Sequence, residues 1–164
     1  VTAWVALSQA SVESGCVRFV PASHIKEAPH ADRPAKGAML SRGQELIEAV
    51  DDSQAVNAPL LPGQMSLHHG LTFHASMPNR SDDRRIGLTI RYIKPSMRQA
   101  EGERGVATLV QGEDRYQNFE LAPRPQSVAA PEDIALWQRA VSIQNQINYQ
   151  DMKTSTDRGG ALRT

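Results

Sequence analysis

The sequence predicts a mainly β protein: a double-sheet β barrel of jelly-roll type, with one amphipathic helix near the C-terminus. Three observations lead to this fold class. Short runs of β-branched and alternating residues recur through residues 1–95, glycine and proline separate these runs, and helical periodicity begins only after residue 130. Short strands followed by a single helix are typical of two packed sheets with helical cover outside.

The chain begins with two predicted strands. Residues 1–7, VTAWVAL, place Thr2 and Trp4 on one face and smaller apolar residues on the other. We expect the Thr2 and Trp4 face to look into a pocket. Residues 16–20, CVRFV, are a second strand that Pro21 ends, and the polar turn between the two runs predicts a hairpin.

A long loop and three short extended segments follow. Residues 22–37 carry two prolines and charges of both signs without periodicity, which predicts a loop over the mouth of a site. We interpret residues 39–50 as a strand followed by a turn, although GQELIEAV also fits a short helix. Residues 55–61 are predicted to be extended, residues 61–64 to form a tight turn, and residues 65–69 to form the next strand.

The stretch from His74 to Tyr92 carries the candidate chemistry. Residues 74–76 are predicted to be a short strand and residues 77–84 a polar loop. Residues 85–93 then form a strand with Arg85 and Arg91 on one face. The opposite face of that strand is apolar and is expected to join a core, through Ile86, Leu88, Ile90 and Tyr92.

The C-terminal part of the chain has a different pattern. Residues 96–130 are polar and contain prolines, which predicts irregular cover over the sheet. Pro131 and the two acidic residues after it predict a helix start. An apolar stripe then runs through residues 131–150, formed by Leu136, Trp137, Ala140, Val141, Ile143 and Ile147. We therefore expect a single domain over residues 1–153 and a disordered tail over residues 154–164.

Composition narrows the range of partners and locations. Eighteen basic residues balance eighteen acidic ones, so electrostatics gives no reason to expect nucleic acid or a membrane surface as a partner. A small-molecule partner is expected instead. The single cysteine, Cys16, and the lack of a long apolar run indicate a cytoplasmic protein. Val1 stands inside an alternating run, so we expect a truncated piece of a longer protein.

Three of the five histidines fall close together, at His68, His69 and His74. In a strand, His68 and His69 point to opposite faces, so at most one of them can join His74 at a metal ion. Ser76 shares the face of His74, and Arg85 begins the returning strand. A metal-bound histidine, a hydroxyl and a guanidinium can together hold a dicarboxylate. An arginine paired with a loop aspartate is the alternative for Arg85.

Several segments together resemble the C-terminal half of bacterial members of the phytanoyl-CoA dioxygenase family. These segments are LLPGQMSLHHGLTFHASMPNRSDDRRIGLTIRYI, VTAWVAL, SGCVRFVPASH and LVQGEDRYQNFEL, and the resemblance runs from residue 1 to about residue 121. It implies a double-stranded β-helix, cupin-like and incomplete at its N-terminal side. It also implies a non-haem oxygenase that uses iron(II), 2-oxoglutarate and O2.

The resemblance assigns roles to individual residues. His74 would be the distal histidine of the metal site, and Arg85 would bind the far carboxylate of 2-oxoglutarate with help from the Ser76 hydroxyl. Thr2 and Trp4 would border the cosubstrate. The remaining assignments are Arg91, near the open positions of the metal, and His69, as a pocket residue.

One departure from the family decides what this chain can do alone. Relatives carry a proximal His-x-Asp just before the Thr-x-Trp strand, so two of three metal ligands would lie upstream of Val1. The internal His30-Ala31-Asp32 falls in the loop segment and is expected to be a charged turn. We therefore expect the chain to be inactive as cut.

The missing pair also leaves the reaction type open. In the family resemblance, an aspartate ligand goes with hydroxylation of a small organic substrate, and a small residue in its place goes with halogenation. A cupin-like domain that binds a ligand without catalysis is the third possibility. An incomplete barrel would expose an open sheet, so a homodimer that covers it is expected.

Overall fold

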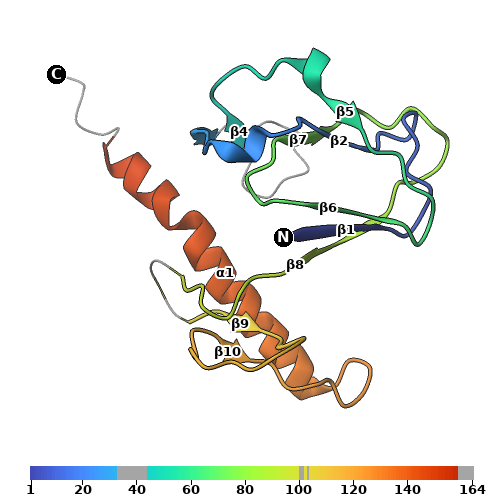
Figure 1. Ribbon diagram of the computed structural model, residues 1–164. Coiled ribbons are helices and arrows are strands. Elements are labelled where there is room, and N and C mark those ends of the chain that lie inside the picture. The colour runs from blue at the N-terminus through green and yellow to red at the C-terminus, as the bar shows by residue number, and fades with distance from the viewer. Residues whose placement is uncertain (33–43, 100–101, 103, 159–164) are drawn as a thin grey trace. The chain divides into compact units, whose positions relative to one another are not determined.

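The computed structural model describes residues 1–32, 44–99, 102 and 104–158. Within these residues the chain forms ten short β-strands followed by one α-helix (Figure 1). This confirms the prediction of a mainly β protein with a C-terminal helix. No helix in the described part of the chain has the length and apolarity needed to cross a membrane.

The chain divides into two compact units. The first comprises residues 1–31 and 45–93, and the second comprises residues 32–44 and 94–164. The boundary after Ile93 lies close to residue 95, where the predicted β core ends. Whether the two units fold together as the expected single domain stays a prediction.

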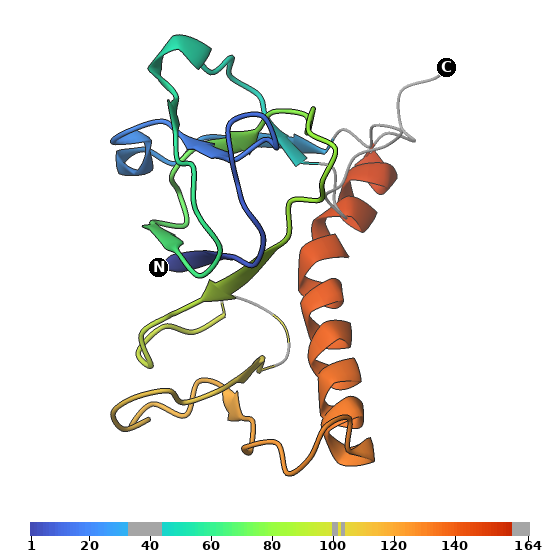
Figure 2. The same cartoon turned by 90° about the vertical axis from the view of Figure 1, so that its right-hand side faces the viewer.

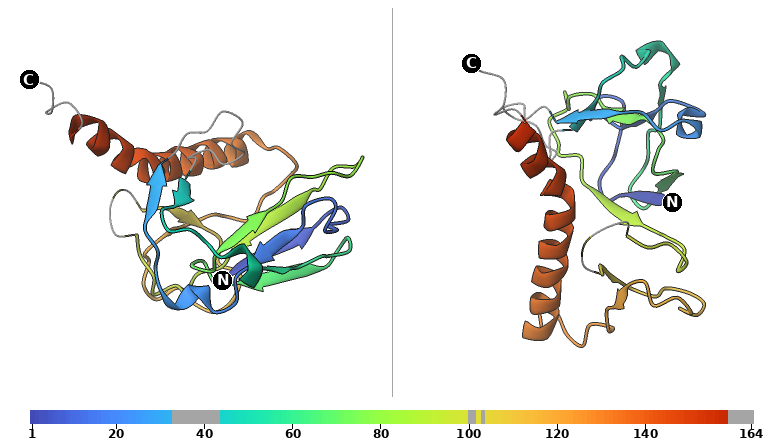
Figure 3. Two further views of the ribbon diagram at one scale, coloured as in Figure 1. Left: turned by 90° about the horizontal axis from the view of Figure 1, so that it is seen from above. Right: turned by 90° about the vertical axis from the view of Figure 1, so that its left-hand side faces the viewer.

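The first unit contains a three-stranded antiparallel sheet in the order β6-β1-β8 (Figure 3). Its strands are β1 (Thr2–Ala6), β6 (Met65–His68) and β8 (Gly87–Arg91). The central strand β1 places Thr2 opposite both His68 and Arg91. Residues directly opposite one another in antiparallel strands share a face, so these three side chains lie on one side of the sheet.

A second antiparallel sheet has the order β5-β2-β7 (Figure 2). Its strands are β2 (Val17–Phe19), β5 (Val56–Asn57) and β7 (His74–Ser76). Phe19 lies opposite His74 in this sheet. Ring contacts between Phe19 and His68 show that the two sheets face each other.

The predicted hairpin between residues 1–7 and 16–20 is wrong, because β1 and β2 belong to different sheets. Residues between them carry the chain from one sheet to the other. A turn fixes these residues. In it, the Ser11 N–H donates to the Ser14 hydroxyl, and the Ser14 N–H donates to the Ser11 hydroxyl. Turn composition predicts that the chain changes direction, but it does not specify which strands pair.

The small buried core of this unit lies at the end of β1, where the segment that crosses to the second sheet begins. It consists of Ala6, Ala10 and Cys16, with Trp4 and Leu60 packed against it. Gly15 has a φ of +74°, and any Cβ there would overlap the main-chain carbonyl of Met77. Glycine is therefore required at the end of the crossing segment.

The apolar face of β8 is not the core that the sequence predicts. Ile86, Leu88 and Tyr92 are all more than 40% exposed. The alternation of β8 does separate an aliphatic side from a polar one, as predicted. The aliphatic side, however, turns away from the second sheet. We call this side of the β6-β1-β8 sheet the outer face; it comprises Ala3, Val5, Met65, Leu67, Leu88 and Ile90.

The connecting segments contain more structure than expected. The segment predicted as one loop includes a 3-10 turn, Ser23–Ile25, and a strand, β3 (His30–Asp32). β3 pairs with β4 (Gln44–Leu46), which confirms the strand interpretation there; residues 33–43 lie outside the described residues. A second 3-10 turn, Asp52–Gln54, precedes β5.

The predicted tight turn at residues 61–64 is confirmed. Gly63 has a φ of +85°, and the Gln64 N–H donates to the Leu61 carbonyl at 3.0 Å. The turn leads directly into β6. It therefore sets the point at which the strand carrying His68 begins.

The second unit contains β9 (Val106–Ala107), parallel to β10 (Glu120–Leu121), and α1 (Pro131–Arg158). The helix begins at Pro131 as predicted, and an ion pair between Arg139 and Glu120 joins it to β10. It runs beyond residue 150 into the segment expected to be disordered. Residues 151–158 contain no glycine or proline, so nothing interrupts the helix there. Residues 159–164 lie outside the described residues.

Candidate functional site

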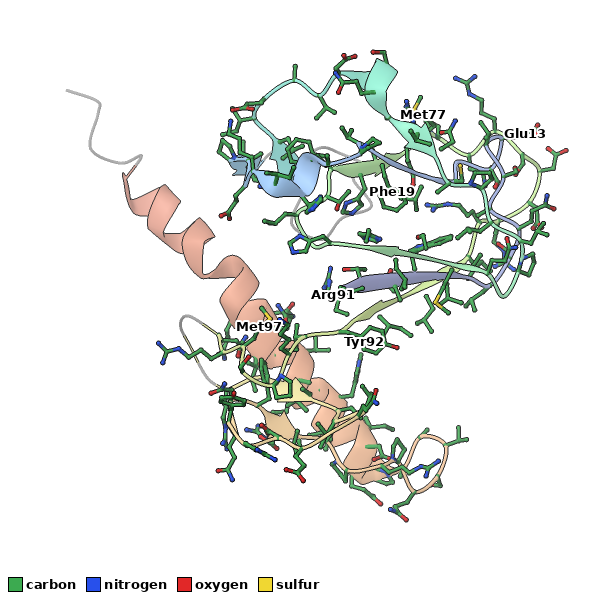
Figure 4. The ribbon with its side chains drawn as sticks, in the orientation of Figure 1. Glu13, Phe19, Met77, Arg91, Tyr92 and Met97 are labelled. Atoms are coloured by element: carbon green, nitrogen blue, oxygen red, sulfur yellow. The ribbon has the colours of Figure 1, made fainter. Side chains whose placement is uncertain are left out.

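His74 lies where the two sheets of the first unit face each other. The ring centre of His68 lies 4.9 Å from that of Phe19 and 5.2 Å from that of His74. His68 comes from β6, whereas Phe19 and His74 come from the facing sheet. Figure 4 marks Phe19 on β2 and Arg91 at the end of β8. We call this side of the β6-β1-β8 sheet the inner face; it comprises Thr2, Trp4, Ser66, His68, Thr89 and Arg91.

His74 has the proton arrangement of a metal ligand. Its Nδ1 lies 2.7 Å from the Thr72 carbonyl oxygen. A carbonyl oxygen only accepts, so Nδ1 must carry the proton and Nε2 keeps its lone pair. Histidines that bind metals commonly donate their second ring N–H to a backbone carbonyl or a carboxylate. His74 therefore fits the ligand role that the family resemblance implies.

His68, rather than His69, lies beside His74. The His68 Nδ1 is buried and has no hydrogen-bond partner. Burial, followed by the nearby His74 and the chain's amino terminus, lowers the pKa of His68 from its usual value of 6.5. The sequence allowed only one of the two adjacent histidines to join His74. It contains no signal for which one, because that depends on the register of β6 against β1.

His69 lies at a different place, just after the end of β6. Its ring centre is 5.5 Å from that of His24, and its Nδ1 accepts a hydrogen bond from the Leu71 N–H at 3.2 Å. This bond places the proton of the neutral ring on Nε2. His69 and His74 thus hold their protons on opposite ring nitrogens.

Arg85 and Trp4, to which the family resemblance gives places beside the cosubstrate, lie in contact with each other. The Arg85 guanidinium carbon lies 5.4 Å from the centre of the Trp4 ring. A cation over an indole face is attracted to it. A Cβ at position 87 would overlap the indole, so Gly87 makes room for the ring. The Trp4 ring therefore supports the guanidinium and leaves its N–H groups free to bind an anion.

The other predicted residues are placed less closely. Thr2 and Arg91 lie opposite each other on the inner face. Ser76 is in β7, on the facing sheet from Arg85, and no hydrogen bond joins the two side chains within the described residues. His30 and Asp32 stand in β3, and the described part of the chain holds no group of three His, Cys, Asp or Glu side chains suited to a metal ion.

A shallow pocket of about 290 Å³ lies elsewhere in the first unit. It contains none of the predicted site residues and is mostly apolar. Its lining consists of Gln9, Ala10, Ser11, Val12, Pro59, Leu60, Leu61 and Gln64.

The sequence model of the family described as "Phytanoyl-CoA dioxygenase (PhyH)" matches residues 1–87. The "Phytanoyl-CoA dioxygenase domain-containing protein 1 homolog" of Caenorhabditis briggsae is 33% identical over 97 residues, covering 56% of this chain and 33% of the relative. "Dioxygenase peniF" of Penicillium patulum is 32% identical over 102 residues, covering 62% of this chain and 27% of the relative. The matched region thus spans a third or less of each curated relative.

Two solved structures share the fold over nearly the whole chain. The first is described as "non-heme monooxygenase; ThoJ apo", with 30% identity and a TM-score of 0.79, covering 93% of this chain and 54% of that one. The second is the "Non-heme monooxygenase, ThoJ-Ni complex", with 30% identity and a TM-score of 0.69, covering 90% of this chain and 51% of that one. The chain therefore corresponds to about half of these proteins.

Proposed function

Because the chain belongs to the phytanoyl-CoA dioxygenase family, we propose that it is part of a non-haem iron(II), 2-oxoglutarate-dependent oxygenase that hydroxylates a small organic substrate. The observation that carries this proposal is His74, whose Nδ1 proton is held by the Thr72 carbonyl so that Nε2 is available to a metal. Bound iron(II) would supply the redox chemistry with O2 and 2-oxoglutarate.

The remaining metal ligands in this proposal are a His-x-Asp pair in a segment that precedes Thr2 and Trp4. The family resemblance supports that order, and the described residues offer no group of three metal-binding side chains. The 164-residue chain alone is then expected to be inactive. The two facing antiparallel sheets support the double-stranded β-helix, or jelly-roll, architecture.

Arg85 is the proposed partner of the far carboxylate of 2-oxoglutarate. Its guanidinium can donate two parallel N–H bonds to a carboxylate, and the Trp4 ring keeps it in place. In the same proposal, Thr2 borders the cosubstrate, Ser76 assists Arg85, Arg91 lies near the open metal positions and His69 lines the pocket. Each of these side chains belongs to the first unit.

The experiment uses the full-length parent protein and measures 2-oxoglutarate-dependent succinate formation. Arg85→Ala is expected to raise the KM for 2-oxoglutarate by about 10- to 100-fold, because charged hydrogen bonds contribute about 1.5–3 kcal/mol. Arg84→Ala is the matched control, since Arg84 is an exposed neighbour. Undiminished turnover by Arg85→Ala at low 2-oxoglutarate would reject the assignment of this carboxylate partner.

The partner proposal concerns the outer face. We propose a homodimer in which two copies cover this face, because Met65 and Leu67 are more than half exposed. The formal net charge of +0 means that two copies would not repel each other over long range.

A further inference from the structure

We propose that Phe19 is a positioning residue that fixes the orientation of the His74 imidazole, with the His68 ring as its counterpart from the facing sheet. The inference rests on the proposed function, in which His74 binds the metal. It goes further because it gives a role to Phe19, which belongs neither to the predicted site nor to the metal ligands. Phe19 and His68 do not bind the metal in this proposal, so the ligands stay His74 and the preceding His-x-Asp.

His74 needs such support because its strand holds it weakly. β7 has three residues and lies at the edge of the β5-β2-β7 sheet, so β2 is its one neighbour among the described strands. The His74 side chain is exposed. The bond from Nδ1 to the Thr72 carbonyl fixes one atom of the ring, and the ring can still turn about that bond. A functional side chain must be held to within about 0.5 Å and 10–20°, so further contacts are required.

Phe19 is placed to supply such a contact. It lies in the central strand of the same sheet, directly opposite His74. At the next position along the strand pair, the Val20 N–H donates to the Phe73 carbonyl. Phe19 and His74 are therefore a non-hydrogen-bonded pair, the kind in which opposite side chains lie closest. Their ring centres are 6.2 Å apart and their planes are tilted by 39°, a geometry in which aromatic rings attract each other.

His68 completes the contact from the other sheet. Its ring centre lies 4.9 Å from that of Phe19 and 5.2 Å from that of His74, with tilts of 45° and 49°. The three rings thus contact one another, and Phe19 is held by pairing on both sides, to Val56 and to His74. A ring contact requires no particular ring nitrogen, so a phenyl ring can replace His68 in this role.

Phe73 offers a matched comparison beside the same histidine. It precedes His74 in sequence and is half-buried like Phe19. Consecutive residues of an extended segment point to opposite faces, however. Within the described part of the chain, Phe73 makes no ring contact with a histidine. Removing either phenyl ring therefore removes similar apolar bulk, but only Phe19 carries the contact to His74.

The first test measures the His74 ring in the metal-free 164-residue chain. Long-range ¹H–¹⁵N spectra show which ring nitrogen carries the proton. We expect Phe19→Leu to raise the fraction of His74 rings with an unprotonated Nδ1 by about 2- to 12-fold, the change that corresponds to one lost aromatic pair. Phe73→Leu should leave this fraction unchanged. Phe19→Tyr and His68→Phe retain the rings and should also preserve it. Phe19→Met replaces Phe19→Leu if the latter unfolds the chain.

The second test measures Co²⁺ binding to the full-length parent by calorimetry. We expect Phe19→Leu to weaken binding by about 2- to 12-fold, Phe73→Leu by less than about twofold, and His74→Ala to abolish it. Unchanged binding in His74→Ala would reject the proposed function at its metal ligand. Loss of binding in His74→Ala, with equal behaviour of Phe19→Leu and Phe73→Leu in both tests, would leave the proposed function standing and reject the role of Phe19. Neither measurement depends on turnover.

Discussion

The two faces of the β6-β1-β8 sheet are built from alternate residues of the same strands, yet they differ in almost every property. The inner face carries Trp4, His68 and Arg91, and the outer face carries Val5, Leu67 and Leu88. The second sheet encloses part of the polar face, where His68 meets Phe19. Leu67, in contrast, is 65% exposed.

This difference shows that burial does not follow hydrophobicity at these positions of the sheet. In most proteins the aliphatic face of a sheet packs against the core. Here Trp4 and His68 are half-buried, whereas Leu67 and Leu88 are exposed. The inner face carries the candidate site, and the outer face is the one proposed to meet a second copy of the chain.

The strongest test of the inner face is Gly87→Val. The new side chain would overlap the Trp4 indole, and overpacking of this kind costs about 1–3 kcal/mol. We expect the free energy of unfolding, measured in urea, to fall by that amount. Thr89→Val, two residues along the same face, should change it by less than about 0.5 kcal/mol. Equal stability of both variants would show that the indole does not occupy this space.

The corresponding test of the outer face is Leu67→Glu. Leu67 is already exposed, so the free energy of unfolding of the monomer should change little. A charge on each copy would repel its partner, and we expect the dimer to weaken at least tenfold, or by about 1.4 kcal/mol. Light scattering across a concentration series measures this. A monomeric unsubstituted chain at high concentration would contradict the dimer itself.

A smaller effect is expected when Trp4 and Val5, which lie on opposite faces of β1, are substituted one at a time. Trp4→Leu removes the ring under Arg85, and cation–π contacts contribute about 0.5–2 kcal/mol. Binding of 2-oxoglutarate to the metal-loaded full-length parent should weaken roughly 2- to 30-fold, measured by calorimetry. Val5→Thr, next in sequence but on the outer face, should leave it unchanged. Similar losses in both variants would point to damage of β1 rather than loss of the support.

The smallest effect is a pH dependence that arises from His68. Its pKa in the folded chain is lowered from 6.5, mainly by burial, so the unfolded chain binds more protons in the window below 6.5. The free energy of unfolding of the metal-free chain should therefore fall as pH falls through that window. His68→Phe should flatten the slope, as measured by urea unfolding in a chelating buffer. A slope retained in that variant would have to come from another titratable group, which would reject His68 as its source.

Local patterns in the sequence predicted the strands and their faces well. The alternation of residues 1–7 separates the two faces of β1, and the proline-glycine turn at residues 61–64 is present as predicted. Pairing could not be predicted in the same way. β1 and β2 have polar residues between them like a hairpin, but each has its partners far along the chain.

The candidate site shows the same limit. Spacing suggested His74 and Arg85, alternation placed Trp4 on a pocket-facing side, and the family resemblance implied their roles. The structure brings Arg85 and Trp4 together. The choice between His68 and His69 depended on a one-residue register, which reverses the face of every side chain in the strand. The apolar stripe also did not predict the end of α1. Residues 151–158 continue the helix but add no residues to the stripe.

The bond that fixes the His74 proton has a consequence for how this site tolerates mutation. Its acceptor is the main-chain carbonyl of Thr72, so any residue at position 72 supplies the same oxygen. The turn that aims this carbonyl is closed by the Thr72 N–H donating to the His69 carbonyl at 3.0 Å. Substitutions in this loop are thus largely silent for the ligand's tautomer, whereas a one-residue insertion or deletion between positions 69 and 74 would change it.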